Sequence, residues 1–391
     1  YQYHKLWVLS QCGSYAYWFF RENTYMETIT VTSPLFPPLE ELEPYLKDIW
    51  KRKWLTNNGY YHQRLEEALC KYLNVPYISL YSNGTLALIA AINVLKLKGE
   101  VITTPYSFVA TSHSLLHSHI TPVFVDIEPN TYNIDPNKIE AAITDKTTAI
   151  LPVHVYGRPC NHEAIQKIAD KYNLPVIYDA AHAFGVKENG NSILNRGNLS
   201  ILSFHATKTY STIEGGAIIC HSAEMKEKLD KYKNFGYTNE TEIDELGFNA
   251  KLNEVQSAFG LLTLDYIDKA IEKRKEVSDF YKTNLSNVPG ITLPNIPKDL
   301  TWNYSYYPII IDKDRYGKTR DELYLELKEN KILSRRYFYP LITDFNIYNQ
   351  YKTKTPIAEK ISENVICLPI HHLLSNDDLN RIINIIKYDY K

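Results

Sequence analysis

One lysine in this sequence stands where a side-chain amine could do chemistry. Lys208 lies between two apolar runs, residues 199–204 and 217–220, which predict two buried strands. Two glycines, Gly215 and Gly216, let the backbone between the runs approach a neighbour closely. A lysine held among buried strands loses its water, which lowers its pKa and makes the amine a nucleophile for carbonyl groups. The alternative is an ordinary loop lysine.

A carboxylate ends another apolar run. Residues 174–179 predict a buried parallel strand that finishes at Asp179, and the ligands of open α/β sheets collect at the carboxyl ends of the strands. Pyridoxal 5′-phosphate requires a lysine that binds its aldehyde and an acid that keeps its pyridine nitrogen protonated, so that the ring withdraws electrons. Lys208 and Asp179 together predict a site for this cofactor. Taken alone, Asp179 could be a helix cap.

A third stretch could hold the phosphate of that cofactor. The turn at residues 82–85, which contains Gly84 and Thr85, follows a short strand-like run and opens an apolar helix. The free N–H groups and the positive dipole end of a helix N-terminus attract anions. Ser203 could add a hydroxyl group. Most such turns are ordinary helix caps, but a phosphate turn, an aspartate and a lysine in this order along one chain strengthen the prediction.

The same stretches carry a resemblance to a known family. From about residue 30 to its end, the chain resembles the DegT family of pyridoxal-phosphate-dependent sugar aminotransferases. The matching motifs are WLTNNG at 54–59, SNGT at 82–85, TPYSFVAT at 104–111, PVFVD at 122–126, DAAH at 179–182, SFHATK at 203–208, EGG at 214–216 and GFNAKLN at 247–253. Some family members carry histidine in place of the lysine and are dehydratases, so Lys208 favours transamination.

The resemblance assigns roles to three further residues around the cofactor. It implies that Phe108 stacks on the pyridine ring and that His182 hydrogen-bonds the ring hydroxyl. It also implies that Asn249, with Lys251 nearby, reaches the cofactor phosphate of a partner subunit, which predicts a homodimer with shared active sites. The alternatives are a core phenylalanine, a structural histidine and an ordinary glycine turn that begins a helix.

Substrate-binding positions also follow from the resemblance. The turn that contains Thr56 and Asn57 is expected near the sugar nucleotide, although Asn-Gly turns are common for purely structural reasons. Tyr337 and Tyr339, in the aromatic and basic patch SRRYFYPL at 334–341, are expected to shape the sugar-nucleotide pocket. His205 is expected to be structural and, by strand alternation, to face away from the cofactor.

The reaction implied is transfer of an amino group from L-glutamate to a dTDP-linked 4-keto-6-deoxyhexose, giving dTDP-4-amino-4,6-dideoxyglucose. The motifs most resemble the branch of the family that uses dTDP-linked keto-6-deoxyhexoses, and they scarcely separate the 4-keto from the 3-keto substrate. A second hypothesis is a non-catalytic regulator that binds the cofactor, because fold does not fix function. A serine or cysteine hydrolase is disfavoured, since the sequence has no nucleophile-elbow motif.

Composition narrows the partners and the compartment. The chain has 391 residues and a net charge of −2, which indicates neither nucleic acid nor an anionic membrane surface as a partner. No apolar run is long enough to span a membrane. The five cysteines are widely spaced and form no CxxC pair, which indicates a reducing cytoplasm and no zinc site. The histidines show no ligand spacing, so no metal is expected.

Alternating elements must position these groups. Strands are expected at 77–81, 100–103, 121–126, 147–153, 174–179, 199–205 and 217–220, and helices at 39–51, 62–73, 107–117, 137–143, 162–172 and 222–236. This βαβ rhythm predicts an α/β fold with a large, doubly wound, mostly parallel sheet, and the resemblance implies the aspartate aminotransferase-like arrangement called fold type I.

Three segments are expected along the chain. Residues 26–270 should form the large cofactor-binding domain, and the stretch at 247–260 should run into a long helix that reaches about residue 285. Residues 271–391 should form a smaller α+β domain, with strands at 304–311 and 365–369 and helices at 319–330 and 377–388. Residues 1–25 read as an extension ahead of a native start at Met26, or as an arm that packs on a partner.

Overall fold

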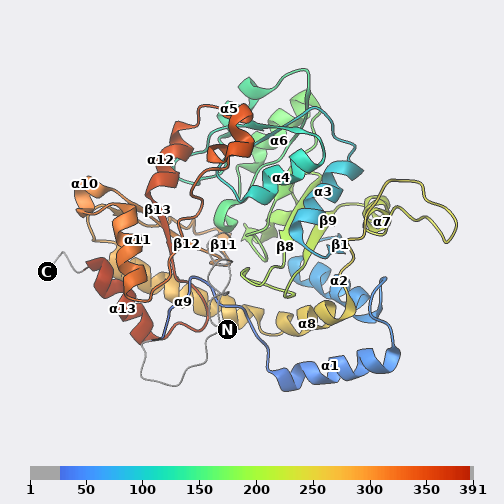
Figure 1. The fold of residues 1–391 in the computed structure, drawn as a ribbon, viewed down its shortest axis with the longest axis horizontal. Coiled ribbons are helices and arrows are strands. Elements are labelled where there is room, and N and C mark those ends of the chain that lie inside the picture. Colours follow the sequence, from blue (N-terminus) through green and yellow to red (C-terminus); the bar gives the residue numbers. More distant parts are fainter. Residues whose placement is uncertain (1–26, 388–391) are drawn as a thin grey trace, which may run out of the picture.

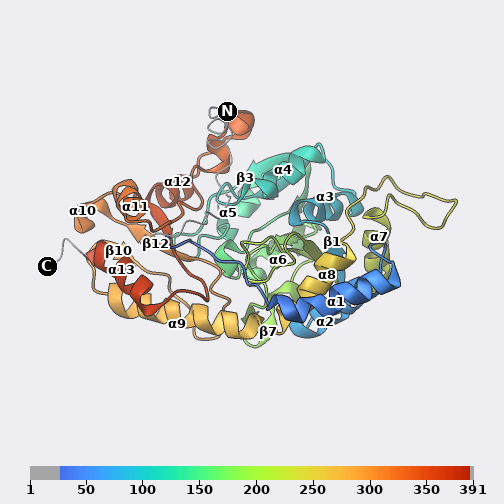
Figure 2. The same cartoon turned by 60° about the horizontal axis from the view of Figure 1, so that its bottom comes forward.

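A computed structural model describes residues 27–387 (Figure 1). The predictions for residues 1–25 and Met26, and the last residue of the helix expected at 377–388, lie outside this range. In both views the helix α7 (Ala223–Tyr232) and the C-terminal helix α13 (Asn376–Lys387) lie at opposite ends of the molecule (Figures 1 and 2). The elements that follow residue 266 gather on the side of α13.

The central sheet is mostly parallel, as predicted. Its strands, in spatial order, are β1 (Tyr77–Tyr81), β9 (Gly216–Cys220), β8 (Leu199–Ser203), β5 (Ile177–Asp179), β4 (Thr147–Ile150), β2 (Glu100–Thr103) and β3 (Thr121–Phe124). Parallel bridges from Ile150 to Val176 and from Val153 to Asp179 join the two halves. Only β9 runs antiparallel to its neighbours in this sheet. It follows β8 after the connection at residues 204–215, which contains Lys208.

Helices cover this sheet. They are α2 (Tyr60–Leu73), α3 (Gly84–Val94), α4 (Val109–His117), α5 (Pro136–Ile139), α6 (His162–Tyr172) and α7, while α8 (Glu254–Leu264) packs on α2 and α1 (Leu39–Arg52) packs on α8. The local sequence explains their limits. In α6, for example, the Asn161 side chain accepts a hydrogen bond from Ala164 N–H at the first turn, and Ile165 and Ala169 face the core. Because helices pack on both faces, the central strands are buried apolar runs.

The prediction of one uninterrupted helix that reaches residue 285 is wrong, because the helix is broken. Two helices occupy this stretch, because α8 ends at Leu264 and α9 (Ile267–Leu285) begins three residues later. At the break, the N–H groups of Asp265 and Tyr266 bond to carbonyls three residues back, at 3.2 and 3.1 Å. Hydrogen bonds to the third residue back, in place of the fourth, tighten the last turn of α8 and end it before α9 begins. The predicted domain boundary between residues 270 and 271 falls inside α9 and stays a prediction.

The C-terminal part contains a second sheet. Its antiparallel strands are β10 (Ile291–Thr292), β12 (Tyr307–Ile311) and β13 (Val365–Leu368). The helices in this part are α10 (Lys313–Tyr316), α11 (Arg320–Glu329), α12 (Pro356–Asn364) and α13. A small third sheet, which the sequence did not predict, joins β6 (Lys187–Glu188), β7 (Asn191–Ser192) and β11 (Leu300–Thr301). Among residues 27–387, no helix is both long and apolar enough to cross a bilayer.

Candidate active site

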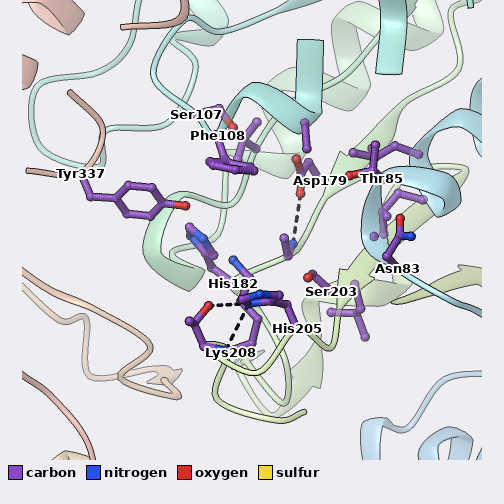
Figure 3. Close-up of a pocket in the computed structure, with 18 of the residues that line it drawn as sticks. Asn83, Thr85, Ser107, Phe108, Asp179, His182, Ser203, His205, Lys208 and Tyr337 are labelled. Atoms are coloured by element: carbon purple, nitrogen blue, oxygen red, sulfur yellow. Dashed lines mark hydrogen bonds between the residues drawn. The ribbon is translucent and has the colours of Figure 1, made fainter. Parts of the chain in front are cut away.

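A cleft of about 210 Å³ opens where the central strands end (Figure 3). Its walls come from segments that follow β1, β2, β5 and β8, and from two C-terminal stretches around residues 306 and 335–338. The predicted residues that the structure brings together there are Gly84, Thr85, Phe108, Asp179, His182, Ser203, Lys208 and Tyr337. The site thus lies at the carboxyl ends of the parallel strands, where α/β sheets bind ligands.

Lys208 occupies the connection between β8 and β9. Its backbone N–H donates to the carbonyl of His205 at 2.9 Å, which shapes the turn. The side chain is half-buried, because the cleft reaches it while protein surrounds its stem. Burial, and to a lesser extent the charge of Arg335, lower the pKa of the Lys208 amine to about 8, while Asp179 acts in the opposite direction. Roughly a tenth of the amine is therefore neutral at pH 7, far more than for a lysine in water.

Asp179 ends β5 with its carboxylate in the cleft. The residue is 5% exposed. Oδ2 accepts a hydrogen bond from the Thr111 hydroxyl at 2.7 Å, and Oδ1 accepts one from the N–H of Ala181 at 3.1 Å. Burial raises the pKa of the Asp179 carboxyl, and these two bonds and the Lys208 charge oppose the rise. A buried carboxylate of this kind can hold a proton on a basic ring nitrogen.

His182 presents one defined ring nitrogen to the cleft. Its Nδ1 accepts a hydrogen bond from the backbone N–H of Tyr156 at 3.2 Å. Burial, with the nearby charges of Lys208 and Arg335, lowers the pKa of His182 well below its usual range, so the ring is neutral. A neutral imidazole that accepts at Nδ1 carries its proton on Nε2 and donates from there.

Phe108, directly before α4, is 49% exposed and lines the cleft, so it is not a core residue.

The turn at the start of α3 can hold an anion. Asn83 caps the helix, since its side chain accepts from Leu86 N–H at 2.9 Å. Within residues 27–387, the N–H groups of Gly84 and Thr85 make no hydrogen bond. A side chain at position 84 would sit 3.1 Å from Cβ of Ser203, so glycine keeps this cradle open. At Gly216, a Cβ would lie 2.5 Å from the Asn83 carbonyl carbon. Two glycines therefore preserve the shape of the turn.

The C-terminal part closes the cleft with aromatic and basic side chains. Tyr337 lines it as predicted, but Tyr339 does not. The Tyr339 ring instead packs under the guanidinium of Arg320, 4.3 Å from its centroid. Sequence reasoning missed Tyr306 and Arg335, which also line the cleft. Arg335 lies in the aromatic and basic patch, whereas the predicted strand at 304–311 gave no sign that Tyr306 faces a ligand.

Other predicted positions lie away from the cleft or face it unexpectedly. Thr56, Asn57 and Asn249 are exposed and do not line it. The expectation that His205 faces away is wrong: His205 lines the cleft, with Nε2 3.6 Å from Oε1 of Glu214. Strand alternation fails at this position because β8 already ends at residue 203. In the part of the chain that the structure describes, no three histidine, cysteine or acidic side chains are grouped to hold a metal ion.

Comparison with known proteins agrees with this arrangement. The profile of the DegT/DnrJ/EryC1/StrS aminotransferase family matches residues 39–387. A Shigella dysenteriae protein named dTDP-4-amino-4,6-dideoxy-D-glucose transaminase is 53% identical over 92% of this chain and 98% of its own length. An Escherichia coli protein of the same name is 49% identical, with the same coverage. The crystal structure of DesI in the presence of its TDP-sugar product superimposes with a TM-score of 0.90, at 30% identity and 93% coverage of both chains.

The cleft also fits the cofactor of this family, pyridoxal 5′-phosphate. It offers a lysine amine with a lowered pKa, a buried carboxylate and a neutral histidine donor. The glycine cradle, with its unpaired N–H groups, suits a phosphate. The family match and the two transaminases rule out the hypothesis of a non-catalytic regulator. The chain belongs to the DegT/DnrJ/EryC1/StrS aminotransferase family and is a pyridoxal-phosphate-dependent aminotransferase of fold type I.

Proposed function

We propose that this enzyme moves an amino group from L-glutamate to a dTDP-linked 4-keto-6-deoxyhexose and forms dTDP-4-amino-4,6-dideoxyglucose. One observation carries the proposal: 53% identity across 98% of the Shigella dysenteriae transaminase named for that product. The Escherichia coli protein of the same name, at 49% identity, supports it. The same chemistry at carbon 3 of the sugar is the alternative.

In this proposal, four residues hold the cofactor at its phosphate and its ring. The N–H groups of Gly84 and Thr85 and the hydroxyl of Ser203 bind the phosphate, because they surround the open cradle at the start of α3. The exposed ring of Phe108 lies against the pyridine ring and keeps it flat in the cleft.

Three residues then supply the proton chemistry. The bound cofactor withdraws electrons from the carbon that loses its proton. Asp179 holds a proton on the pyridine nitrogen, which keeps that withdrawal strong. The Nε2–H of His182 donates to the ring hydroxyl oxygen. The Lys208 amine binds the cofactor at rest. When freed by the donor, Lys208 Nζ would take the proton from the donor's α-carbon and deliver it to C4′ of the cofactor. A base so placed contributes roughly 10²- to 10⁴-fold to the rate.

The active form in this proposal is a homodimer with shared sites. Asn249 serves the cofactor phosphate of the neighbouring subunit, and its exposure outside its own cleft supports that role. Thr56, Asn57, Tyr337 and Tyr339 contact the sugar nucleotide. The enzyme works in the cytoplasm, as the free thiols of Cys70, Cys160, Cys220 and Cys367 among the described residues also suggest.

Product analysis tests the substrate. The holoenzyme is given L-glutamate with either the 4-keto or the 3-keto dTDP-6-deoxyhexose, and the amino sugar is identified by mass and by NMR. The expected product carries nitrogen at carbon 4 and forms only from the 4-keto sugar. An amine at carbon 3 alone would overturn the proposal in favour of the alternative. Loss of the cofactor's absorbance with L-glutamate alone tests the donor separately.

A further inference from the structure

Next to His182, one tyrosine holds a backbone conformation that residues with a side chain rarely adopt. Tyr156 has φ of 55° and ψ of 20°, which is the left-handed region. Glycine enters this region readily, whereas the Cβ of any other residue crowds the following carbonyl oxygen. Such strain persists only where the surrounding contacts fix the conformation, and it gathers at functional sites. Tyr156 is fully buried and does not line the cleft, so it acts on the site through a neighbour.

The backbone contacts of Tyr156 show what this conformation achieves. Its N–H donates to Nδ1 of His182, in the cleft of Figure 3, at 3.2 Å. Its carbonyl accepts from Nε1 of Trp302 at 2.8 Å and from the hydroxyl of Ser305 at 3.1 Å. A change of φ and ψ would alter the angle between the N–H and the carbonyl. The left-handed conformation therefore keeps both sets of bonds, one to the cleft histidine and one to the stretch before β12.

The surroundings of Tyr156 lock this arrangement. The Tyr156 hydroxyl lies 2.7 Å from that of Tyr106. Gly157 follows with φ of +80°, and a Cβ there would lie 2.6 Å from the carbonyl oxygen of His182. Asn303 donates to that same carbonyl oxygen at 2.8 Å. His182 is thus held at its ring and at its backbone by residues that do not line the cleft themselves.

We propose that Tyr156 is a positioning residue that sets the tautomer of His182. A neutral imidazole carries one proton, and an N–H aimed at Nδ1 keeps that proton off Nδ1. The proton is then on Nε2, the nitrogen that donates to the ring hydroxyl of the cofactor. The inference rests on the proposed function only for the group that Nε2–H meets. Without the Tyr156 N–H, either ring nitrogen could carry the proton.

The tautomer decides how His182 acts on the cofactor. A donor at the ring hydroxyl stabilises the ionised form and lowers the pKa of that hydroxyl. With its proton on Nδ1, His182 would accept through Nε2 and favour the protonated form. Loss of the tautomer should therefore raise the midpoint of the cofactor's absorbance titration by roughly 1 to 2 pH units, the effect of one hydrogen bond to a charged group. Lys208 and Arg335, the charges that act on His182, are kept in every variant.

Exchange of one backbone group tests the proposal. The hydroxy-acid analogue of tyrosine at position 156 replaces the peptide N–H by an ester oxygen and keeps the side chain. The same exchange at Val155, whose N–H donates to Oδ1 of Asn133 at 2.9 Å, is the matched control. The holoenzyme's absorbance midpoint should rise in the ester at 156 and stay at the wild-type value in the ester at 155. NMR of the ring nitrogens in histidine-labelled enzyme, with and without the cofactor, should place the His182 proton on Nε2 in wild type and at least partly on Nδ1 in the ester at 156.

Ordinary substitutions give a second measurement that does not depend on the ester. Trp302→Phe removes one bond to the Tyr156 carbonyl and should raise the midpoint by a smaller amount. Tyr304→Phe is its control, since the Tyr304 ring lies 5.1 Å from the Trp302 ring and its loss of a hydroxyl leaves Tyr156 untouched. His182→Gln, whose amide accepts at one atom and donates from the other, should stay near wild type. His182→Phe should raise the midpoint and abolish the effect of Trp302→Phe.

A His182 proton that stays on Nε2 in the ester at 156 would overturn the inference, and so would equal shifts in the esters at 155 and 156. If the ester at 156 does not fold, equal midpoints for Trp302→Phe and Tyr304→Phe would overturn it. A proton that moves to Nδ1, with a midpoint unchanged both in that ester and in His182→Phe, has another meaning. It would remove the proposed contact between His182 and the ring hydroxyl, and Tyr156 would remain the residue that sets the tautomer.

Discussion

Thr111 donates a 2.7 Å hydrogen bond to the carboxylate of Asp179, and both side chains are buried. The Thr111 hydroxyl also lies 2.7 Å from that of Ser107, so with its proton directed at Asp179 it accepts from Ser107. This relay runs from the start of α4 to the end of β5. Burial raises the pKa of the Asp179 carboxyl. The hydrogen bond from Thr111 opposes that rise, because it stabilises the ionised form.

Thr111→Val should therefore slow the half-reaction with L-glutamate. The substitution keeps the volume but removes a hydrogen bond to a charged group, which predicts a rate about tenfold lower with the cofactor still bound. Stopped-flow absorbance measures the rate, and Asp179→Asn, expected to be slower by orders of magnitude, sets the limit. If Thr111→Val reacts at the wild-type rate while Asp179→Asn is slow, the N–H of Ala181 holds the carboxylate without help.

The lowered pKa of Lys208 predicts how cofactor capture depends on pH. Only the neutral amine attacks the cofactor's aldehyde, so the capture rate of cofactor-free enzyme should rise with pH and level off above about pH 8. For a lysine in water, the midpoint of this rise would lie at about pH 10.4. Because the Arg335 charge lowers the pKa of Lys208, Arg335→Gln should move the midpoint upward, and Arg336→Gln should not. A wild-type midpoint near that of free lysine would contradict the assignment of burial as the cause.

Gly216→Ala should damage both stability and cofactor binding. The new Cβ would lie 2.5 Å from the Asn83 carbonyl carbon and 2.6 Å from the Gly84 nitrogen, so β9 and the phosphate turn must separate. Overpacking of this kind costs about 1–3 kcal/mol of unfolding free energy. Urea denaturation of cofactor-free enzyme and a cofactor titration measure the two effects. Gly190→Ala is the control: its Cβ would have open space, but its φ of +77° strains an alanine, so it should lose some stability and keep its cofactor affinity.

Shared active sites predict that two inactive chains can restore activity together. Lys208→Ala and Asn249→Ala subunits are mixed in equal amounts. One site of each mixed dimer then has both native residues, and the other has neither. Free exchange makes about half of the dimers mixed, so activity should approach about a quarter of wild type. If exchange is confirmed, the Asn249→Ala chain is folded and no activity returns, Asn249 does not serve a neighbouring subunit.

The sequence predicted the framework of the fold well because its signals are local. The strands at 77–81 and 100–103 and the helix at 162–172 have the predicted bounds, since each is an apolar or amphipathic run with a clear stop. The strand predicted at 174–179 is shorter, beginning at residue 177. Nothing in the run at 217–220 distinguishes an antiparallel strand from a parallel one, because a strand buried on both faces has the same composition in either direction.

The candidate site was predictable only where one short motif carries the chemistry. Asp179 ends a recognisable strand and Lys208 follows another, and both line the cleft. Arg335 and Tyr306 reach it from elements that are distant in the sequence, and no local pattern marks either as a residue that faces a ligand. His205 was misplaced for a related reason: the two-residue alternation holds only inside a strand, and the backbone turns directly after residue 203.

The pairing of β1 with β9 has a consequence for synthesis on the ribosome. Tyr77 lies opposite Cys220, which is made 143 residues later. At about 5–20 residues per second, β1 emerges and waits on the order of ten seconds before its partner exists. Through that interval its backbone edge is open to pairing with other strands. The nascent chain therefore stays exposed to misassembly until β9 has been made, so the catalytic Lys208 is already part of the chain before β1 finds its partner.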